Sequence, residues 1–175
     1  MDGILNDFNS FFIKYHNLKF NTNFEVCTEN MQDYDIVKAL NIPQENFDEI
    51  LLLDEFWENL PVKEYAQESV EKLYSYFDIY ILTAPYIQNI NNFTIKINWI
   101  KKYFSFIDLN KVIFCYYKYL IDGQDSYLID DNPTHLQKWK GTPTTLEYPF
   151  NENVKSIRFK DWKEIVEHLC WYNEV

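Results

Sequence analysis

Four short apolar runs divide the second half of the chain. They read DIYILT (78–83), KVIFC (111–115), SYLID (126–130) and TTLEY (144–148), and each is rich in Ile, Val, Leu, Tyr or Phe. Runs of this length and composition, bounded by polar residues, are typical of β-strands. Because helical or loop segments separate them, the pattern predicts an α/β fold with a mostly parallel sheet flanked by helices.

Apolar residues at helical spacing predict the helices around these strands. The opening segment repeats its aromatic residues at this spacing, which predicts a first helix that ends near Asn17. Segments 63–77 and 92–104 each carry one apolar face, and residues 161–172 predict a closing helix. We find no internal repeat and no linker, so we expect one domain over all 175 residues, with a helical insertion at about 20–62.

The charge balance narrows the class of partner. The chain has 27 acidic and 16 basic residues and a net charge of −11. Proteins that bind long nucleic acids need clustered Lys and Arg, so we expect no such partner. Residues 94–118 nevertheless contain several lysines and the single acid Asp108, which suits either a small anionic substrate or a solvated helix face. These lysines are Lys96, Lys101, Lys102, Lys111 and Lys118.

The cysteines and the lengths of the apolar runs indicate the cellular compartment in which the protein is expected. Cys27, Cys115 and Cys170 are far apart and form no C-x-x-C pair, so the sequence indicates neither a disulfide framework nor a zinc site. No apolar run approaches the roughly 18 residues of a membrane helix, and the first residues lack the basic start of a signal peptide. We therefore expect a cytoplasmic protein with no membrane partner.

Polar residues that end the apolar runs are the candidates for chemistry, because ligands of open α/β sheets gather at the carboxyl ends of the strands. Thr83 and Ala84 end the first run before Pro85. A hydroxyl followed by free N–H groups can hold phosphate oxygens, or it can simply form a turn. Asp130 and Asp131 emerge together after the third run, which suits either a magnesium site or an acid-rich turn.

Lys118 follows the second run and is expected at the same edge of the sheet. Its ammonium there would be either a fixed charge for a phosphate or a solvated loop residue. Aromatic residues make up 19% of the chain, so rings are expected in the core and in the wall of any pocket.

Taken together, these segments resemble the haloacid dehalogenase (HAD) superfamily phosphatases, and within them the 5'(3')-deoxyribonucleotidases. That family opens with D-x-D-G-V/I-L-x-D-F, and this chain opens with MDGILNDF. FWENLPVKEYA resembles the family's cap, ILTAP its threonine motif, YLIDDNP its acidic motif and GTPTTLEYPFN its Gly-to-Asn stretch. The resemblance covers essentially the whole chain in order. It implies a Rossmann-like HAD fold with a small helical cap.

The resemblance also implies a role for each matching residue. In the family the first Asp of D-x-D attacks phosphorus and forms an aspartyl-phosphate. Asp2 matches the second Asp, the general acid and base, whose main-chain carbonyl also binds magnesium. Thr83, Ala84 and Lys118 match positions that hold the phosphoryl oxygens. Asp131, with Asp130 beside it, would complete the magnesium site, and Asp131 is favoured as the direct ligand.

The cap would supply specificity. Phe8 matches the position of a ring against the nucleobase, and Phe56 or Trp57 would form another wall, although any of these rings could instead be core. Three histidines match no family motif and are expected to be structural or surface residues: His16, His135 and His168.

The match starts in the middle of the catalytic motif. The first Asp would be the residue before Met1, and the family's central apolar strand would lie before that. One interpretation is that the true start of the protein lies upstream of Met1. A second is that the chain is a degenerate relative that binds nucleotide or partners without turnover. A third is that it is a phosphatase that acts on another small phosphomonoester.

The expected activity is that of a 5'-nucleotidase-type phosphoric monoester hydrolase. With magnesium it would remove phosphate from (deoxy)ribonucleoside monophosphates. The 175-residue form should be nearly inactive, because it lacks the nucleophile. Base preference and oligomeric state, including a homodimer, stay open.

Overall fold

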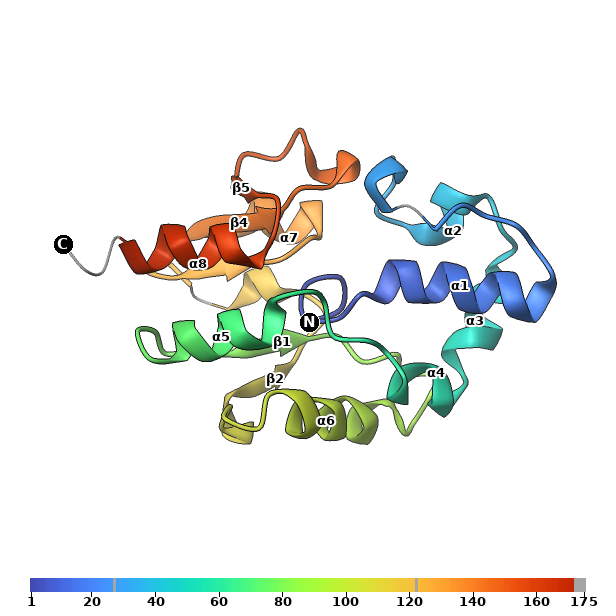
Figure 1. Ribbon diagram of the computed structural model, residues 1–175, viewed down its shortest axis with the longest axis horizontal. Coiled ribbons are helices and arrows are strands. Elements are labelled where there is room, and N and C mark those ends of the chain that lie inside the picture. Colours follow the sequence, from blue (N-terminus) through green and yellow to red (C-terminus); the bar gives the residue numbers. More distant parts are fainter. Residues whose placement is uncertain (27, 122, 172–175) are drawn as a thin grey trace.

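Parallel strands in two sheets form the centre of the protein (Figure 1). The structure, a computed structural model, describes residues 1–26, 28–121 and 123–171, so Cys27 and Tyr172 lie outside the described residues. In the first sheet, β1 pairs with β2. In the second, β4 lies between β3 and β5. The strands are β1 (Ile81–Thr83), β2 (Val112–Phe114), β3 (Tyr127–Ile129), β4 (Thr142–Leu146) and β5 (Ile157–Phe159).

Helices surround these strands. The α-helices are α1 (Phe8–Phe20), α2 (Ile36–Leu40), α3 (Gln44–Leu51), α4 (Asp54–Glu58), α5 (Ala66–Tyr74), α6 (Asn92–Tyr103), α7 (Pro133–Lys138) and α8 (Trp162–Trp171). Short 3-10 helices are η1 (Thr28–Asn30), η2 (Leu109–Lys111), η3 (Lys118–Leu120) and η4 (Pro149–Asn151). Every pairing between the named strands is parallel, which confirms the predicted α/β fold.

The helices include one pair that lies against the strands and a separate group at one end of the molecule. Helices α5 and α8 pack against each other, and Figure 1 shows both in front of the strands. Helices α1 to α4 lie together at the end of the molecule opposite α8 (Figure 1). Fully buried rings join this second group, with Phe12 of α1 edge-on to Phe56 of α4 at 6.2 Å between centroids. The predicted insertion at 20–62 stays a prediction, since α1 also lies in this group.

Several element boundaries differ from the sequence prediction. Helix α1 continues to Phe20, where Asn21 ends it in the left-handed conformation that Asn tolerates. Strand β4 begins at Thr142, two residues before the predicted run, and contains Pro143. Strand β5 was not predicted, because its three residues include Arg158.

Other features of the described residues agree with the sequence. Helix α3 follows Pro43, α6 matches the predicted amphipathic helix, and α8 matches the predicted closing helix. Cys115 and Cys170 are free thiols. Within the part of the chain that the structure describes, every helix is too short or too polar to cross a membrane.

Candidate active site

A tight turn places the first acidic residue of the site. The main-chain N–H groups of Ile4 and Leu5 both donate to the Met1 carbonyl, at 3.2 and 2.7 Å. Gly3 at the centre of the turn has a φ of 73°, in the left-handed region that favours glycine. A Cβ at this position would overlap the Asp131 carboxylate. Glycine is therefore required here both by the backbone and by the close approach of Asp131.

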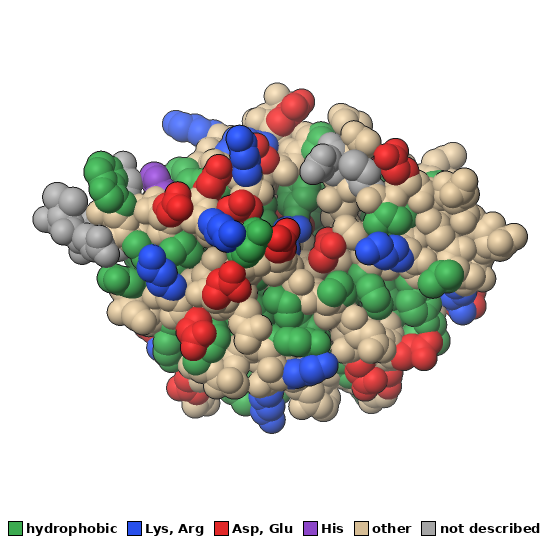
Figure 2. Space-filling model, viewed as in Figure 1, with side chains coloured by type: hydrophobic (Ala, Val, Ile, Leu, Met, Phe, Trp, Pro, Cys, Tyr) green, Lys and Arg blue, Asp and Glu red, His purple; other side chains and the backbone are tan. Residues whose placement is uncertain are grey.

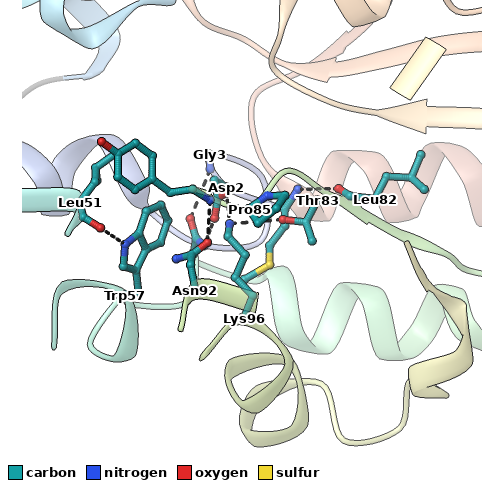
Figure 3. A network of polar contacts seen from close by, with 12 residues as sticks. Asp2, Gly3, Leu51, Trp57, Leu82, Thr83, Pro85, Asn92 and Lys96 are labelled. Carbon is teal, nitrogen blue, oxygen red and sulfur yellow. Dashed lines mark hydrogen bonds and ion pairs between the residues drawn. The ribbon is translucent and has the colours of Figure 1, made fainter. Parts of the chain in front are cut away.

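Asp2 projects from this turn toward Lys96 of α6 (Figure 3). Its Oδ2 forms an ion pair with Lys96 Nζ, and its Oδ1 accepts a hydrogen bond from Asn6 Nδ2 at 2.9 Å. Lys96 Nζ also donates to Thr83 Oγ1 at 3.3 Å and lies 4.8 Å from the centre of the Trp57 ring. A single buried ammonium thus joins the N-terminal turn, the end of β1 and α4.

The ion pair determines the charge state of Asp2. Burial alone would raise the pKa of the Asp2 carboxyl, but Lys96 and the Met1 amine outweigh it, and the net pKa is lowered. Burial lowers the pKa of Lys96, and Asp2 offsets part of this effect. The site therefore holds Asp2 as a carboxylate when no substrate competes for Lys96.

Lys96 was named only among the lysines of residues 94–118, for which an anionic substrate and a solvated face stayed open, and no motif assigned it to the site. The solvated-face interpretation is wrong for it, because only 1% of Lys96 is exposed, whereas Lys101 and Lys102 are exposed. The spacing contained a signal: Lys96 falls on the buried stripe of α6 between Ile95 and Trp99. A lysine on the apolar face of a helix needs a buried partner, and here that partner is Asp2.

A second ion pair lies at the end of β3. Lys118 of η3 pairs with Asp130, and both side chains are buried. Burial would raise the pKa of Asp130, yet Lys118 and His135 hold it far below its usual range. His135 Nδ1 lies 3.5 Å from Asp130 Oδ1, and its Nε2 lies 2.9 Å from the Tyr116 carbonyl oxygen. No motif indicated this contact of His135.

The other predicted histidines fall elsewhere. His16 is buried between Thr22 and Asn46, with hydrogen-bond distances of 2.9 and 3.2 Å, so it is structural as predicted. His168 packs on Phe159 in the closing helix region, with 5.1 Å between ring centroids.

Asp131 differs from its neighbour because it forms no ion pair with any described residue. Burial and the adjacent Asp130 carboxylate raise the pKa of Asp131 to about 7. A buried carboxylate of this kind is stabilised by a cation, and magnesium needs only one or two carboxylates, with phosphate and water as further ligands. Asp131 fits such an ion.

The three predicted metal residues do not form one ligand cluster. The structure brings together no group of three or more His, Cys, Asp or Glu among the described residues. The carboxylates of Asp2 and Asp130 face Lys96 and Lys118 instead. Of the three side chains, only the Asp131 carboxylate is therefore without an ion pair among the described residues and able to bind magnesium directly. The resemblance indicates the main-chain carbonyl of Asp2 as a second ligand.

An aromatic cavity opens beside these acids. It has a volume of about 230 Å³, and its lining includes Asp2, Asp131 and Ala84 together with the rings of Phe8, Phe47 and Trp57. Figure 2 shows apolar side chains in a hollow near the middle of this face, with acidic and basic side chains beside it.

The rings of this cavity partly match the sequence prediction. Phe8 and Trp57 lie 5.8 Å apart between centroids, and Trp57 Nε1 donates to the Leu51 carbonyl at 2.8 Å, which fixes the indole. Phe56 does not line the cavity: it is 0% exposed and packs behind Phe8 in the core. Of the two walls considered for this position, the structure selects Trp57.

Most of the predicted site residues thus lie at one place. Asp2, Ala84 and Asp131 line the cavity, and Thr83 is joined to them through Lys96. The ends of β1 and β3 meet the N-terminal turn there, as expected for a ligand site of an α/β protein. The fold and this arrangement define a protein of the HAD-like class.

Comparison with known proteins identifies the family within that class. Residues 1–171 match the family described as 5' nucleotidase, deoxy (pyrimidine), cytosolic type C protein, and the chain belongs to this family. It is 36% identical over 123 residues to the 5'(3')-deoxyribonucleotidase of Clostridium acetobutylicum, an alignment that covers 70% of this chain and 65% of the relative.

Two further relatives are similar. A Staphylococcus aureus (strain MSSA476) protein, provisionally named for the same activity, is 34% identical over 124 residues, or 69% of this chain and 66% of the relative. The 5'(3')-deoxyribonucleotidase of Bacillus subtilis (strain 168) is 28% identical over 116 residues, or 66% of each chain. The chain therefore spans about two thirds of the length of the relatives it matches.

Proposed function

We propose that this chain carries the site of a phosphatase that releases phosphate from deoxyribonucleoside and ribonucleoside monophosphates. The observation that supports this most is the meeting of Lys96, Thr83 and Asp2 beside a cavity walled by Phe8 and Trp57. Buried ammonium and hydroxyl groups suit a phosphate dianion, because charge-assisted hydrogen bonds are strong where water is excluded. Aromatic rings suit a nucleobase and tolerate different bases.

Each side chain has a role in this proposal. Thr83, the Ala84 N–H and the ammonium groups of Lys96 and Lys118 bind the phosphoryl oxygens and offset the charge that shifts onto them. Lys96 turns from Asp2 to the phosphate when substrate enters. Asp2, no longer neutralised by Lys96, then binds the proton that it gives to the departing ribose oxygen, and it later takes a proton from the attacking water.

The nucleophile in this proposal is an aspartate bonded directly to the Met1 nitrogen. Its carboxylate forms a bond to phosphorus while the ribose oxygen leaves, and water then cleaves the aspartyl-phosphate to inorganic phosphate. The surroundings of the Met1 nitrogen support this position, because it lies within the electrostatic influence of Lys118, Asp2, Asp130 and Lys96.

Magnesium is the proposed cofactor. Asp131 and the main-chain carbonyl of Asp2 would hold it, with Asp130 beside them. When bound, magnesium supplies positive charge that polarises the phosphoryl oxygens. The buried carboxylate of Asp131, which has no cation partner among the described residues, supports this assignment.

The test compares three forms of the protein with magnesium and a panel of deoxynucleoside monophosphates. The first is the 175-residue chain; the second carries an apolar strand that ends in Asp before Met1; the third has Asn in place of that Asp. We expect phosphate release only from the Asp form. Equal release from all three forms would show that the nucleophile assignment is wrong.

The alternatives predict different outcomes of the same assay. Nucleotide binding without release in any form would favour a binding protein, and release from sugar phosphates but not from nucleotides would favour another phosphomonoester. Reading the DNA upstream of Met1 in frame gives an independent check, because an apolar stretch that ends in Asp is expected there.

A further inference from the structure

Asn9 is a polar residue on the inward face of α1. It precedes Ile13 by one helical turn and His16 by two, and both of these residues are buried. Residues at this spacing share one face of a helix, so the Asn9 side chain points inward as well. At this end of α1 the inward face meets the aromatic cavity, whose lining includes Asn9 next to Phe8.

The Asn9 carboxamide has no hydrogen-bond partner in the described part of the chain. Two other asparagines near the site are engaged: Asn6 donates to Asp2 at 2.9 Å, and Asn92 accepts from the Tyr86 N–H at 2.9 Å. A carboxamide has two N–H donors and one acceptor oxygen. Because Asn9 is partly covered by protein, these groups face the cavity and are left for a ligand of the cavity.

The other uncharged polar side chains of the lining are engaged or lie near its acids. Trp57 Nε1 and the Tyr86 hydroxyl both donate hydrogen bonds within the protein, at 2.8 and 2.9 Å. The Tyr34 hydroxyl lies close to the acids, because burial and the charge of Asp131 raise the pKa of Tyr34 well above its usual value. Among the described side chains of the lining, Asn9 therefore has the uncommitted donors and acceptor that can meet the base of a nucleotide.

The carboxamide of Asn9 and the ring of Phe8 suit two different parts of a nucleobase. Successive residues of a helix point about 100° apart around its axis, so the two side chains approach the cavity from different directions. A ring binds the face of a base by stacking. A carboxamide carries a donor and an acceptor side by side and pairs with the edge of a base, where donors and acceptors also lie side by side.

We propose that Asn9 is a specificity-determining residue that binds the hydrogen-bonding edge of the nucleobase. This inference rests on the proposed function and deepens it, because it names the feature of the substrate that the cavity selects. A substrate whose base lacks hydrogen-bonding groups leaves the carboxamide unpaired, which costs free energy. The carboxamide can rotate to exchange its oxygen and nitrogen, so Asn9 accepts keto bases and amino bases alike.

The first experiment compares two substrates of nearly the same shape, thymidine 5'-monophosphate and its difluorotoluene analogue, whose fluorines accept hydrogen bonds poorly. Their kcat/KM values are measured with magnesium for the form with Asp before Met1 and for the same form with Asn9→Leu. We expect a preference of about tenfold or more for the thymidine nucleotide, as one good pair of base contacts provides, and its loss in Asn9→Leu. The same ratio in both proteins would overturn the inference. Each ratio is taken within one protein, so a difference in the folded fraction does not affect it.

Two controls accompany this comparison. Asn23→Leu, at an exposed asparagine outside the cavity lining, should keep the preference of the original protein. Deoxyribose 5-phosphate, which has no base, should be hydrolysed equally by the original protein and by Asn9→Leu. If Asn9→Leu lowers kcat/KM for deoxyribose 5-phosphate as much as for the thymidine nucleotide, then Asn9 contacts the sugar or the phosphate and the inference is wrong.

A binding measurement separates this inference from the proposed function. Thymidine 5'-monophosphate is titrated into the 175-residue chain, and the side-chain amide signals of Asn9 are followed by NMR. We expect these signals to shift, and Asn9→Leu to bind the nucleotide about tenfold more weakly. Equal affinity of the two chains would overturn the role of Asn9 and leave the phosphatase proposal standing. Weaker binding by Asn9→Leu, without phosphate release from the form with Asp before Met1, would support Asn9 and contradict the phosphatase proposal.

Discussion

Lys96 Nζ lies 3.3 Å from Thr83 Oγ1, although one residue comes from a helix and the other from the end of a strand. The same ammonium pairs with Asp2 and lies over the Trp57 ring. Because all three partners approach one charge, the position of the N-terminal turn relative to β1 and α4 depends on Lys96. The first prediction concerns the loss of this charge.

Replacing Lys96 with Met keeps most of the aliphatic stem and removes the ammonium. We expect the free energy of unfolding to fall by about 3 kcal/mol, because breaking a buried ion pair leaves its partner uncompensated. Urea denaturation measures the change. Lys101→Met, on the exposed side of the same helix, is the control and should stay within about 0.5 kcal/mol of the original chain. If Lys96→Met and Asp2→Asn lose stability additively when combined, the two residues are not coupled as described.

Gly3→Ala should destabilise the protein by about 1 to 3 kcal/mol. The substitution forces a side chain into a left-handed φ of 73° and against the Asp131 carboxylate. Thermal unfolding measures the loss. Repeating Gly3→Ala in an Asp131→Ala background separates the two causes, because only the backbone strain should persist there. An equal loss in both backgrounds would mean that the approach of Asp131 is not a steric constraint.

The Asp131 carboxyl should make stability depend on pH in a defined direction. Its pKa rises from 3.8 to about 7 on folding, through burial and the neighbouring Asp130, so the folded chain binds more protons than the unfolded chain between about pH 4 and 7. This contribution is fully present below about pH 4 and is lost as the pH rises through 7. The free energy of unfolding, measured without metal ions, should therefore fall with pH more steeply for the original chain than for Asp131→Asn.

The exposed Glu68 provides the matched control for this experiment. Glu68→Gln should follow the original chain at every pH. Parallel curves for the original chain and Asp131→Asn would contradict the raised pKa. Comparing variants is essential because the Met1 amine, whose pKa falls from 8.0 to about 5, adds stability in the opposite direction as the pH rises from 5 to 8.

Phe8→Ala should weaken nucleotide binding through the base rather than through the phosphate. Stacking on an aromatic side chain contributes about 1 to 3 kcal/mol per base, so the KM for a deoxynucleoside monophosphate should rise about tenfold in the form with Asp before Met1. The KM for deoxyribose 5-phosphate, which has no base, should change little. Phe93→Ala, an exposed ring outside the cavity, is the control. Equal changes for both substrates would show that Phe8 does not contact the base.

Much of the fold can be predicted from the sequence because each apolar run marks a strand and a polar residue marks the end of that strand. Thr83 and Asp130 were predicted as site residues from their place after such runs, and both lie where β1 and β3 end. Strand β5 could not be predicted in this way, since Ile157 and Phe159 surround an arginine that bonds to Asn151. Its pairing with β4 is a tertiary effect that a window of three residues does not encode.

The candidate site was harder to predict where a residue acts through a distant partner. Lys96 and Asp2 are 94 positions apart, so neither residue alone indicates a buried ion pair. The contact between His135 and Asp130 likewise depends on how α7 leaves β3. Phe56 and Trp57 are adjacent in sequence, and only the packing of α4 decides which ring meets the cavity.

The two ends of the described chain differ in a way that matters for handling the protein. The Met1 nitrogen is buried against Leu82, whereas Trp171 at the end of α8 is 67% exposed. A purification tag fused to the first residue would be attached to this buried nitrogen, so its sequence would help decide whether the protein folds. A tag placed after the closing helix meets no such demand, so preparations for assay should be tagged there.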